Sequence, residues 1–349
     1  MTLIYFILIL GIIVLVHEFG HFIFAKMFGV HVYEFSIGMG PKIWGKKRKN
    51  KKDETEYCIR AIPIGGFVSL AGEEIDDDKK VPKDKKMYNK PIWQRFLIMF
   101  FGAGNNFILA FLILFLCGIF FGSPNMDPVV GKLTEGYPMV ESGIEEGDKF
   151  LKVNGNKIST IDDVRIYLSV VKPGDTITFE MKKESGKVVT YEVAPVKEVV
   201  DEVTTYRYGI EFINETEKGF FAPIKYAFEK TGALFKQMFI TLKLLFTGQV
   251  GMDNLSGPVG IYSIVGQTRS AGIESVLQLV ALLSINVGFI NLLPFPAFDG
   301  GRILFLIIEK IKGSPVNPKV ENIFHSIGFV LLLLLLLYIT FNDIVRMFF

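Results

Sequence analysis

The sequence predicts a polytopic α-helical membrane protein, with about four transmembrane helices and an inserted β-rich domain. Four long stretches of the 349 residues are strongly apolar, and a helix needs about 20 such residues to cross a bilayer. The chain also carries 38 Lys and Arg and 36 Asp and Glu, which must contact water, so a chain buried wholly in lipid is excluded. Residues 126–197, between the second and third apolar stretches, alternate apolar and polar side chains as β-strands do.

The composition narrows the class of protein further. Hydrophobic residues make up 50% of the chain and the mean hydropathy is +0.38, which excludes a disordered protein. The net charge of +2 gives no argument for nucleic acid binding. Two cysteines are too few for a disulfide framework. We therefore expect apolar spans joined to ordinary soluble stretches, with no nucleic acid partner.

The candidate spans follow from the apolar stretches. They are Thr2–Phe24, Phe96–Phe121, Val276–Phe298 with its continuation Arg302–Ile308, and Ser326–Phe341. The fourth is short, but its flanking residues Tyr338, Asn342 and Arg346 are typical of a membrane interface. A cleaved signal peptide at the N-terminus is disfavoured, because this segment lacks a basic start and a small-residue cleavage site and contains a charged residue.

The distribution of Lys and Arg predicts the orientation of the spans. Residues 25–95 contain 16 Lys and Arg, whereas the chain before the first span contains none. A second basic loop, with Lys310, Lys312 and Lys319, lies between the third and fourth spans. Basic loops are retained on the cytoplasmic side of a membrane. We therefore expect both basic loops inside the cell, and the N-terminus and the long middle region outside.

The middle region is expected to form a β-rich domain followed by a helix. Strands are predicted at Thr176–Lys182 and Val188–Val193, with a turn at Glu184–Gly186 between them. Gly219–Phe246 has the pattern of an amphipathic helix with several Lys near one face. Such a helix can lie flat on the bilayer or pack on the soluble domain, and we favour the membrane surface.

The first span contains the sequence H-E-x-x-H, at His17, Glu18 and His21. An ionisable side chain at mid-bilayer costs at least about 2.5–3.5 kcal/mol, so a specific interaction must compensate for these three. Helix positions i and i+4 share a face, at a spacing that lets two imidazoles hold one Zn²⁺. Glu18 would then be close enough to contact a metal-bound water. The alternative is a pair of histidines hydrogen-bonded to other spans, which is less favoured in a span with no other charge.

A catalytic zinc site has three protein ligands, so one more must come from elsewhere. Asp299 is the best candidate, because Pro294 and Pro296 must interrupt the third span just before it. An interrupted helix at membrane depth lines a cavity or packs on protein, and Asn291 and Asp299 would face that cavity. Two further histidines lie at the ends of spans and are expected at the membrane interface: His31 and His325.

At these residues the sequence resembles the site-2 proteases, specifically the bacterial RseP/RasP-type intramembrane zinc metalloproteases with a single PDZ domain. The resemblance covers nearly the whole chain. His17–His21 is similar to the HExxH of that family, and Asn291–Gly301 to its N-x-x-P-x-P-x-x-D-G-G motif. Glu141–Asp148 followed by Val153–Gly155 resembles a PDZ strand and turn. Ala103 is a departure, since the family usually has Pro there.

The resemblance implies roles for individual residues. Its zinc ligands would be His17, His21 and Asp299, with Glu18 as the catalytic acid and base and Asn291 supporting substrate or intermediate. A stretch from residue 35 to 41 resembles the membrane-dipping β-hairpin that presents substrate as an extended strand. The substrate-binding residues of this hairpin would be Phe35, Ser36, Ile37 and Gly38.

The expected domain organisation has four parts. Residues 1–121 would hold the first two spans and the cytoplasmic hairpin loop, and 122–200 an extracytoplasmic PDZ domain. Residues 201–275 would form a linker with the amphipathic surface helix, and 276–349 the last two spans with the third zinc ligand. The PDZ domain would bind a trimmed substrate C-terminus or exclude bulky substrates from the site, and the sequence leaves both roles open.

The implied function is regulated intramembrane proteolysis by a zinc endopeptidase of the bacterial cell membrane. The substrates would be single-span membrane proteins, such as anti-sigma factors or remnant signal peptides. A zinc protease of the HtpX type is one alternative, but its third ligand is a downstream Glu, and the Asn291–Gly301 motif argues against it. A non-catalytic PDZ scaffold or metal-handling protein is another, but it would not need Glu18 between the histidines.

Overall fold

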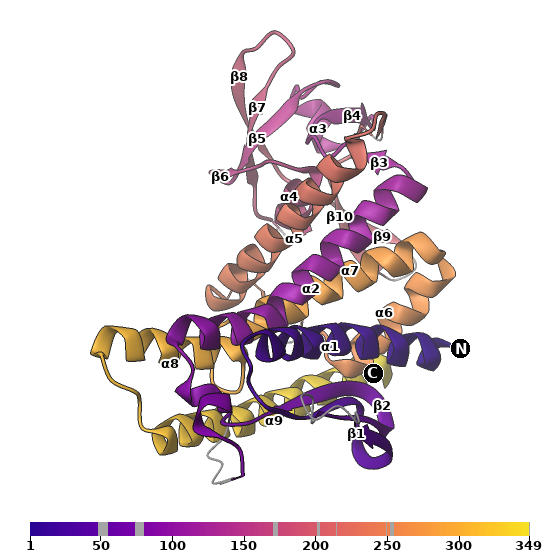
Figure 1. Ribbon diagram of the computed structural model, residues 1–349. Helices are drawn as coiled ribbons and strands as arrows, with labels where there is room; N and C mark the ends of the chain where they lie inside the picture. The colour runs from indigo at the N-terminus through magenta and orange to yellow at the C-terminus, as the bar shows by residue number, and fades with distance from the viewer. Residues whose placement is uncertain are drawn as a thin grey trace. The chain divides into compact units, whose positions relative to one another are not determined.

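The computed structural model describes residues 1–47, 55–73, 80–169, 174–200, 203–213, 215–248, 250–251 and 255–348 (Figure 1). The chain forms two compact units. The first consists of Met1–Ile113 and Met252–Phe349, and the second of Leu114–Gly251. Both ends of the chain therefore belong to the unit that contains the predicted zinc ligands.

The prediction of four membrane spans is confirmed. In the described part of the chain, four helices are long and apolar enough to cross a bilayer. They are α1 (Thr2–Met27), α2 (Ile92–Phe120), α7 (Ile273–Asn291) and α9 (Pro318–Phe348). The last helix extends beyond the predicted Ser326–Phe341 at both ends, because polar residues continue it past the apolar run. Ala103 is buried within α2, which runs as one helix through this position.

The third span is interrupted as its prolines predict. Helix α7 ends at Asn291, and α8 (Asp299–Lys312) begins after a non-helical stretch, residues 292–298. A Cβ at Gly300 would overlap the carbonyl groups of Leu292 and Leu293, so only glycine lets α8 start this close to the end of α7. This return of the chain brings Asp299 back towards α7.

The first basic loop forms a sheet from two bent strands, β1 (Val32–Lys47) and β2 (Glu56–Leu70), which lies along α1 (Figure 1). Residues 34–37 pair with 66–69 on one side and with 56–59 on the other. Residues 42–47 pair with 56–60. The resulting order across the sheet is 42–47, 56–60, 32–39 and 62–70. Residues 62–70 thus form the edge of this sheet beside α1.

A short helix, α6 (Pro258–Ser270), precedes α7 and was not expected from the sequence. Its start is glycine-rich and its apolar pattern is weak. The carboxylate of Asp343 on α9 accepts a hydrogen bond from the Gly260 N–H at 2.8 Å, in the first turn of α6. A side chain at Gly257 or Gly260 would crowd this carboxylate. The two helices are therefore joined through a polar contact near the end of the chain. Two 3₁₀ turns, Lys83–Lys85 and Met87–Asn89, lead into α2.

The second unit contains the predicted β-rich domain. One sheet has the order β6-β5-β7-β8, from Asn156–Lys157, Lys149–Val153, Ile177–Lys182 and Val188–Val193, which confirms both predicted strands. Antiparallel pairs are formed by β4 (Val130–Leu133) with β11 (Ile210–Phe212), β3 (Ser123–Pro124) with β12 (Thr216–Glu217), and β9 (Val196–Val200) with β10 (Val203–Arg207). Two helices complete the fold, α3 (Pro138–Glu141) and α4 (Ile161–Ser169). We call residues 123–213 the inserted domain.

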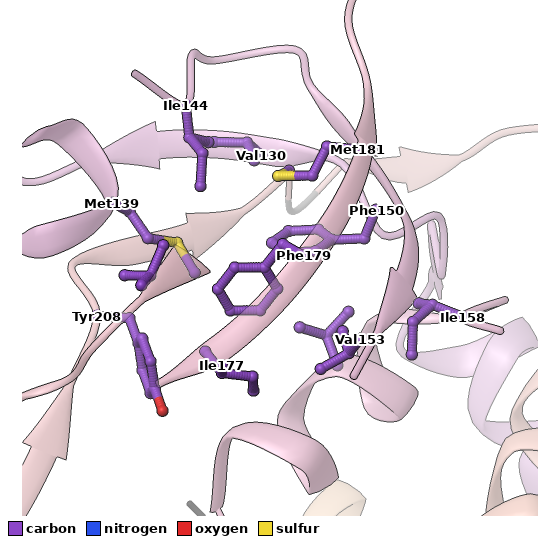
Figure 2. Packing of buried hydrophobic residues seen from close by; sticks show 12 residues of the cluster. Val130, Met139, Ile144, Phe150, Val153, Ile158, Ile177, Phe179, Met181 and Tyr208 are labelled. Carbon is purple, nitrogen blue, oxygen red and sulfur yellow. The ribbon is translucent and has the colours of Figure 1, made fainter. Parts of the chain in front are cut away.

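Figure 2 shows the core of the inserted domain. Phe150 and Phe179 are fully buried at its centre, with ring centroids 5.4 Å apart in an edge-to-face arrangement. The surrounding side chains come from every layer of the domain, including Val130, Met139 and Ile177. Such a continuous core indicates a domain that is stabilised by its own packing.

The predicted amphipathic helix is present as α5 (Ala222–Phe246). Lys230 forms an ion pair with Asp162 at 2.6 Å, and Lys236 with Asp163 at 2.7 Å, which join α5 to α4 of the inserted domain. Other positions of α5 expose large aromatic side chains: Phe228, Phe239 and Phe246. The basic face thus contacts the soluble domain, whereas a position of the helix on the bilayer surface stays a prediction.

Candidate active site

The two histidines of the H-E-x-x-H sequence lie one turn apart on α1 and face the same side. Both are buried, and their Nε2 atoms are 3.3 Å apart. Asp299, the first residue of α8, places its Oδ2 atom 3.2 Å from Nε2 of His17 and 3.3 Å from Nε2 of His21. The three predicted ligands therefore converge, although they come from opposite ends of the chain.

These distances fit a zinc ion. With bond lengths near 2.0–2.1 Å, the edges of a tetrahedral zinc site are about 3.3–3.4 Å long. The observed triangle has edges of 3.2, 3.3 and 3.3 Å. The three atoms would thus occupy one face of the tetrahedron and leave its fourth corner open, as a catalytic site requires.

A hydrogen bond at Nδ1, the ring nitrogen that faces away from Asp299, orients His21. Its Nδ1 atom donates to the backbone carbonyl of Ile98 on α2 at 2.8 Å, so its Nε2 atom presents a lone pair. The Oδ2 atom of Asp299 is buried and receives no hydrogen bond from the described residues. Lone pairs that converge without a donor between them need a cation, which supports a metal at this position.

Asn106 on α2 supports His17 in the same manner. Its amide nitrogen is 3.5 Å from Nδ1 of His17, and its buried Oδ1 atom has no hydrogen bond within the part of the chain that the structure describes. Exchanging the amide oxygen and nitrogen lets Nδ1–H of His17 donate to this oxygen, which satisfies both groups. The hydroxyl of Ser284 on α7 donates to the backbone carbonyl of Asn106 at 2.9 Å and fixes this part of α2.

Close packing of α1 on α2 encloses the imidazole of His21. A Cβ at Gly20 would overlap the backbone carbonyl of Phe101, and one at Gly102 would overlap the ring of His21. The two helices can approach this closely only because both positions are glycine. The ring of His21 is thereby enclosed on the α2 side, while its Nε2 atom lies near Asp299 and His17.

Comparison with known proteins decides the family. The sequence model of peptidase family M50 matches residues 5–335, which is nearly the whole chain. The chain belongs to peptidase family M50. It is therefore a membrane-embedded zinc metalloprotease, as the H-E-x-x-H sequence within the first span predicts.

Several M50 relatives match this chain from end to end. CPE1693 of Clostridium perfringens, a zinc metalloprotease by inference, is 39% identical over 346 residues, which cover 99% of each chain. The regulator of sigma-W protease RasP of Bacillus subtilis is 34% identical over 427 residues, again with 99% of each chain covered. The zinc metalloprotease RasP of Bacillus licheniformis is 33% identical over 426 residues, at the same coverage.

Part of the chain matches solved structures. One of these is the PDZ domain of an SdrC-like protein from Listeria innocua, with 18% identity and a TM-score of 0.21. The match covers 27% of this chain and 98% of that structure.

Glu18 follows His17 on α1, beside the three converging atoms of this M50 site, and its carboxylate has a backbone partner in the described chain. Its Oε2 atom accepts a hydrogen bond from the backbone N–H of Val68 at 3.0 Å. Val68 belongs to the edge segment of β2, so the sheet and the H-E-x-x-H helix meet at this carboxylate. The segment 62–70 is therefore the part of the sheet that lies nearest to Glu18.

One sequence expectation is placed differently by the structure. The segment 35–40 was expected to offer a free edge strand, but residues 34–37 are paired on both sides, so Phe35, Ser36 and Ile37 have no free backbone edge. Gly38 sits at the turn, with φ of 85°, where a Cβ would lie 2.6 Å from the carbonyl oxygen of Ile62. Each strand bends and so contributes two paired segments to the sheet. The free edge beside α1 is therefore formed by the second half of β2, residues 62–70.

The remaining polar candidates lie outside the triangle. The Nδ2 atom of Asn291 donates to the backbone carbonyl of Val287, one turn earlier on α7, at 3.0 Å. His31 precedes β1, where its backbone N–H donates to the carbonyl of Lys85. His325 packs beside the loop before Asp299, a contact for which no local sequence signal exists. It was expected only as an interfacial residue.

Proposed function

We propose that this M50 protease cleaves the transmembrane segments of single-span membrane proteins, with anti-sigma factors and remnant signal peptides as its substrates. The proposal rests on the convergence of His17, His21 and Asp299 next to Glu18, within or beside apolar spans. A site enclosed in this way acts on segments that enter from the bilayer. The name of the Bacillus subtilis relative, a regulator of sigma-W protease, supports the anti-sigma class.

In the proposed mechanism His17, His21 and Asp299 hold the zinc ion. When bound, zinc supplies Lewis-acid polarisation of the scissile carbonyl and lowers the pKa of a water molecule towards about 7. Glu18 takes a proton from the attacking water and delivers it to the nitrogen of the leaving amine. Asn291 can donate to the substrate carbonyl or the oxyanion once it releases the carbonyl of Val287.

The edge of the sheet is the proposed substrate platform. A transmembrane helix must unwind before hydrolysis, because each of its carbonyls is held in an i→i−4 hydrogen bond. Residues 62–70 pair on one side only within the described chain, so an unwound segment can add as a further strand beside Glu18. Apolar side chains exposed on the sheet support its contact with lipid: Ile37, Ile43, Trp44, Ile59 and Ile62.

The inserted domain is proposed to bind an end of the substrate. A pocket of about 430 Å³ lies between α4 and the strands at Tyr208, and both Arg165 and Arg207 line it. The hydroxyl of Tyr208 is buried, has no hydrogen-bond partner among the described residues, and points away from the core (Figure 2). Cationic side chains together with an unused hydroxyl suit a peptide carboxylate. This favours binding of a trimmed C-terminus over simple exclusion of bulky substrates.

The orientation is proposed from the charges of the loops. The basic loop at 25–95 and the loop with Lys310, Lys312 and Lys319 would face the cytoplasm of a bacterial cell. The N-terminus and the inserted domain would then be extracytoplasmic. On this orientation, the metal site lies toward the cytoplasmic side of the membrane.

The proposal is tested by Glu18→Gln in the full-length protein. The neutral amide keeps the shape of the side chain but cannot accept a proton, so we expect zinc to be retained and cleavage of a co-expressed single-span substrate to stop. Glu141→Gln, an exposed position on the inserted domain, is the matched control and should cleave normally. Unchanged cleavage by Glu18→Gln would refute the role of Glu18 and favour the non-catalytic alternative.

The same variant identifies the substrates. Membrane proteins that are normally cleaved should accumulate as intact spans in cells that carry Glu18→Gln instead of the parent protein. Mass spectrometry of their membranes would detect these segments. If soluble proteins accumulate in place of single-span membrane proteins, the proposed substrate class is wrong.

A further inference from the structure

The loop that carries the third zinc ligand has an unusual backbone. Apart from glycines, only two described residues have a positive φ, and one of them is Ala297, at 75°. A Cβ is crowded in this left-handed region, so alanine adopts it only when its surroundings impose it. Ala297 lies two residues before Asp299. The conformation of this residue therefore sets the direction in which the chain enters α8.

Helix α9 supplies a contact that holds this conformation. The backbone N–H of Ala297 donates a hydrogen bond to Nδ1 of His325 at 3.0 Å. This N–H lies outside any helix, so no intrahelical carbonyl accepts from it. Phe305 and Phe324 pack against the imidazole and restrict its rotation.

The backbone of α9 also lies directly against the loop. A Cβ at Gly328 would overlap Pro296, so α9 can approach the loop only with glycine at this position. On the other side of the imidazole, a Cβ at Gly301 would lie 3.2 Å from Cε1 of His325. The ring of His325 thus fills the space between α9, the loop and the first turn of α8.

We propose that His325 is a positioning residue for the metal site: by accepting from Ala297, it holds the loop in the conformation that presents Asp299 to His17 and His21. This inference rests on the proposed ligand set. His325 is not among the residues whose ligand atoms converge in the described chain, which are His17, His21 and Asp299. It acts through the backbone.

The test compares His325→Asn with His325→Gln in the full-length protein. The Oδ1 atom of asparagine can occupy the place of Nδ1, whereas the longer glutamine places its polar atoms where Nε2 was. Both variants are polar and of moderate size. Zinc affinity is measured by competition with a chelator. We expect His325→Asn to bind zinc nearly as the parent does and His325→Gln to lose about 10–100-fold, as outer contacts of metal ligands typically do.

A second substitution separates positioning from general damage. Glycine adopts a positive φ without crowding, so Ala297→Gly in the His325→Gln background should need the hydrogen bond less and recover at least about fivefold in zinc affinity. The visible absorption of the Co²⁺-substituted protein gives an independent reading of ligand geometry. The spectrum should change in His325→Gln and return towards that of the parent in the double variant.

The controls distinguish failure of this inference from failure of the ligand set. His31→Ala, at the other non-ligand histidine, should leave zinc affinity unchanged. If Asp299→Ala loses zinc but His325→Gln and His325→Asn bind it as the parent does, the inference alone is overturned. Equal losses in both His325 variants without recovery by Ala297→Gly would also overturn it. If Asp299→Ala retains zinc, the ligand set is overturned and the inference with it.

Discussion

Two glycines shape the proposed metal site, because neither carries a side chain that would hold α1 and α2 apart. Gly20 and Gly102 allow α1 and α2 to approach until the ring of His21 meets the backbone of α2. The hydrogen bond from His21 to the carbonyl of Ile98, and the amide of Asn106 beside Nδ1 of His17, then fix which nitrogen of each ring faces Asp299. The ligand geometry is thus a property of α2 as much as of the helix that carries the histidines.

Gly102→Ala tests this packing. A Cβ at this position would overlap the imidazole of His21, so we expect the ring to be displaced and zinc affinity to fall by at least about tenfold, as for other changes next to metal ligands. Alanine favours a helix over glycine, so α2 itself should not be weakened. Gly232→Ala on α5, where an added Cβ meets nothing within 4 Å, is the matched control. Normal zinc binding by Gly102→Ala would contradict the packing argument.

Two residues of the inserted domain make its stability depend on pH. Burial raises the pKa of Tyr208 to about 12. Burial alone would lower the pKa of Lys183, but hydrogen bonds to Asp148, Tyr191 and Glu145 outweigh it and raise this pKa above its usual value. Both groups hold their protons more tightly in the folded state. Their stabilisation is therefore complete below about pH 10 and is lost as the pH rises above it.

The expected loss is measurable in the full-length protein. The urea concentration at which an alkaline protease first cuts within residues 123–213 should fall between pH 8 and pH 11. Tyr208→Phe removes one titrating group, so the urea concentration at which cutting begins should fall less over the same pH range. If this urea concentration does not change with pH for the parent protein, the proposed effect of Tyr208 and Lys183 on stability is wrong.

At the scale of elements, the edge of β2 connects the sheet to the H-E-x-x-H helix. Val68 lies opposite Phe35, and its N–H points outward to Glu18 instead of into the sheet. One strand therefore both contacts the carboxylate of Glu18, the proposed catalytic group, and offers the only edge on this side of the described sheet.

Val68→Pro tests the role of this edge. Proline removes the N–H but no hydrogen bond within the sheet, and edge strands tolerate it. We expect zinc to be retained and kcat/KM for a membrane substrate to fall by about 10–100-fold, the range for loss of a hydrogen bond to a charged group. Val68→Ala keeps the N–H and is the matched control. Cleavage by Val68→Pro at the parent rate would contradict the proposed platform.

The sequence predicted most elements that consist of local pattern, and it missed those set by distant contacts. The four spans and the break at Pro294 and Pro296 follow from apolar runs and from the missing N–H of proline. The order of segments in the β1–β2 sheet does not follow from the sequence. It depends on which of four short segments pair, and the alternation of apolar and polar residues is the same in each. Helix α6 was missed because its start is rich in glycine and its apolar pattern is weak.

For the site, the same distinction holds. The three converging ligands could be found because ionisable side chains are costly within apolar spans, so His17, His21 and Asp299 stood out in the sequence. Asn106 and His325 could not be found in this way. Their roles arise from contacts with residues far along the chain, at His17 and Ala297 respectively.

For the whole molecule, the proposed orientation makes a prediction about accessibility. Cys58 and Cys117 are buried, so they should react slowly with a membrane-impermeant maleimide. In a variant without these two thiols, Glu141→Cys on the inserted domain should be labelled in intact cells. Asp84→Cys, in the first basic loop, should be labelled only after the membrane is opened. The reverse pattern would invert the topology.

The division of the ligand triangle between the two ends of the chain has a consequence for biosynthesis. The ribosome delivers His17 and His21 among the first residues, but Asp299 follows only after the inserted domain and two further membrane helices have been made. On the proposed ligand set, a nascent chain therefore lacks one ligand until Asp299 has been made. We expect it to acquire zinc, and to cut neighbouring membrane proteins, only after that point.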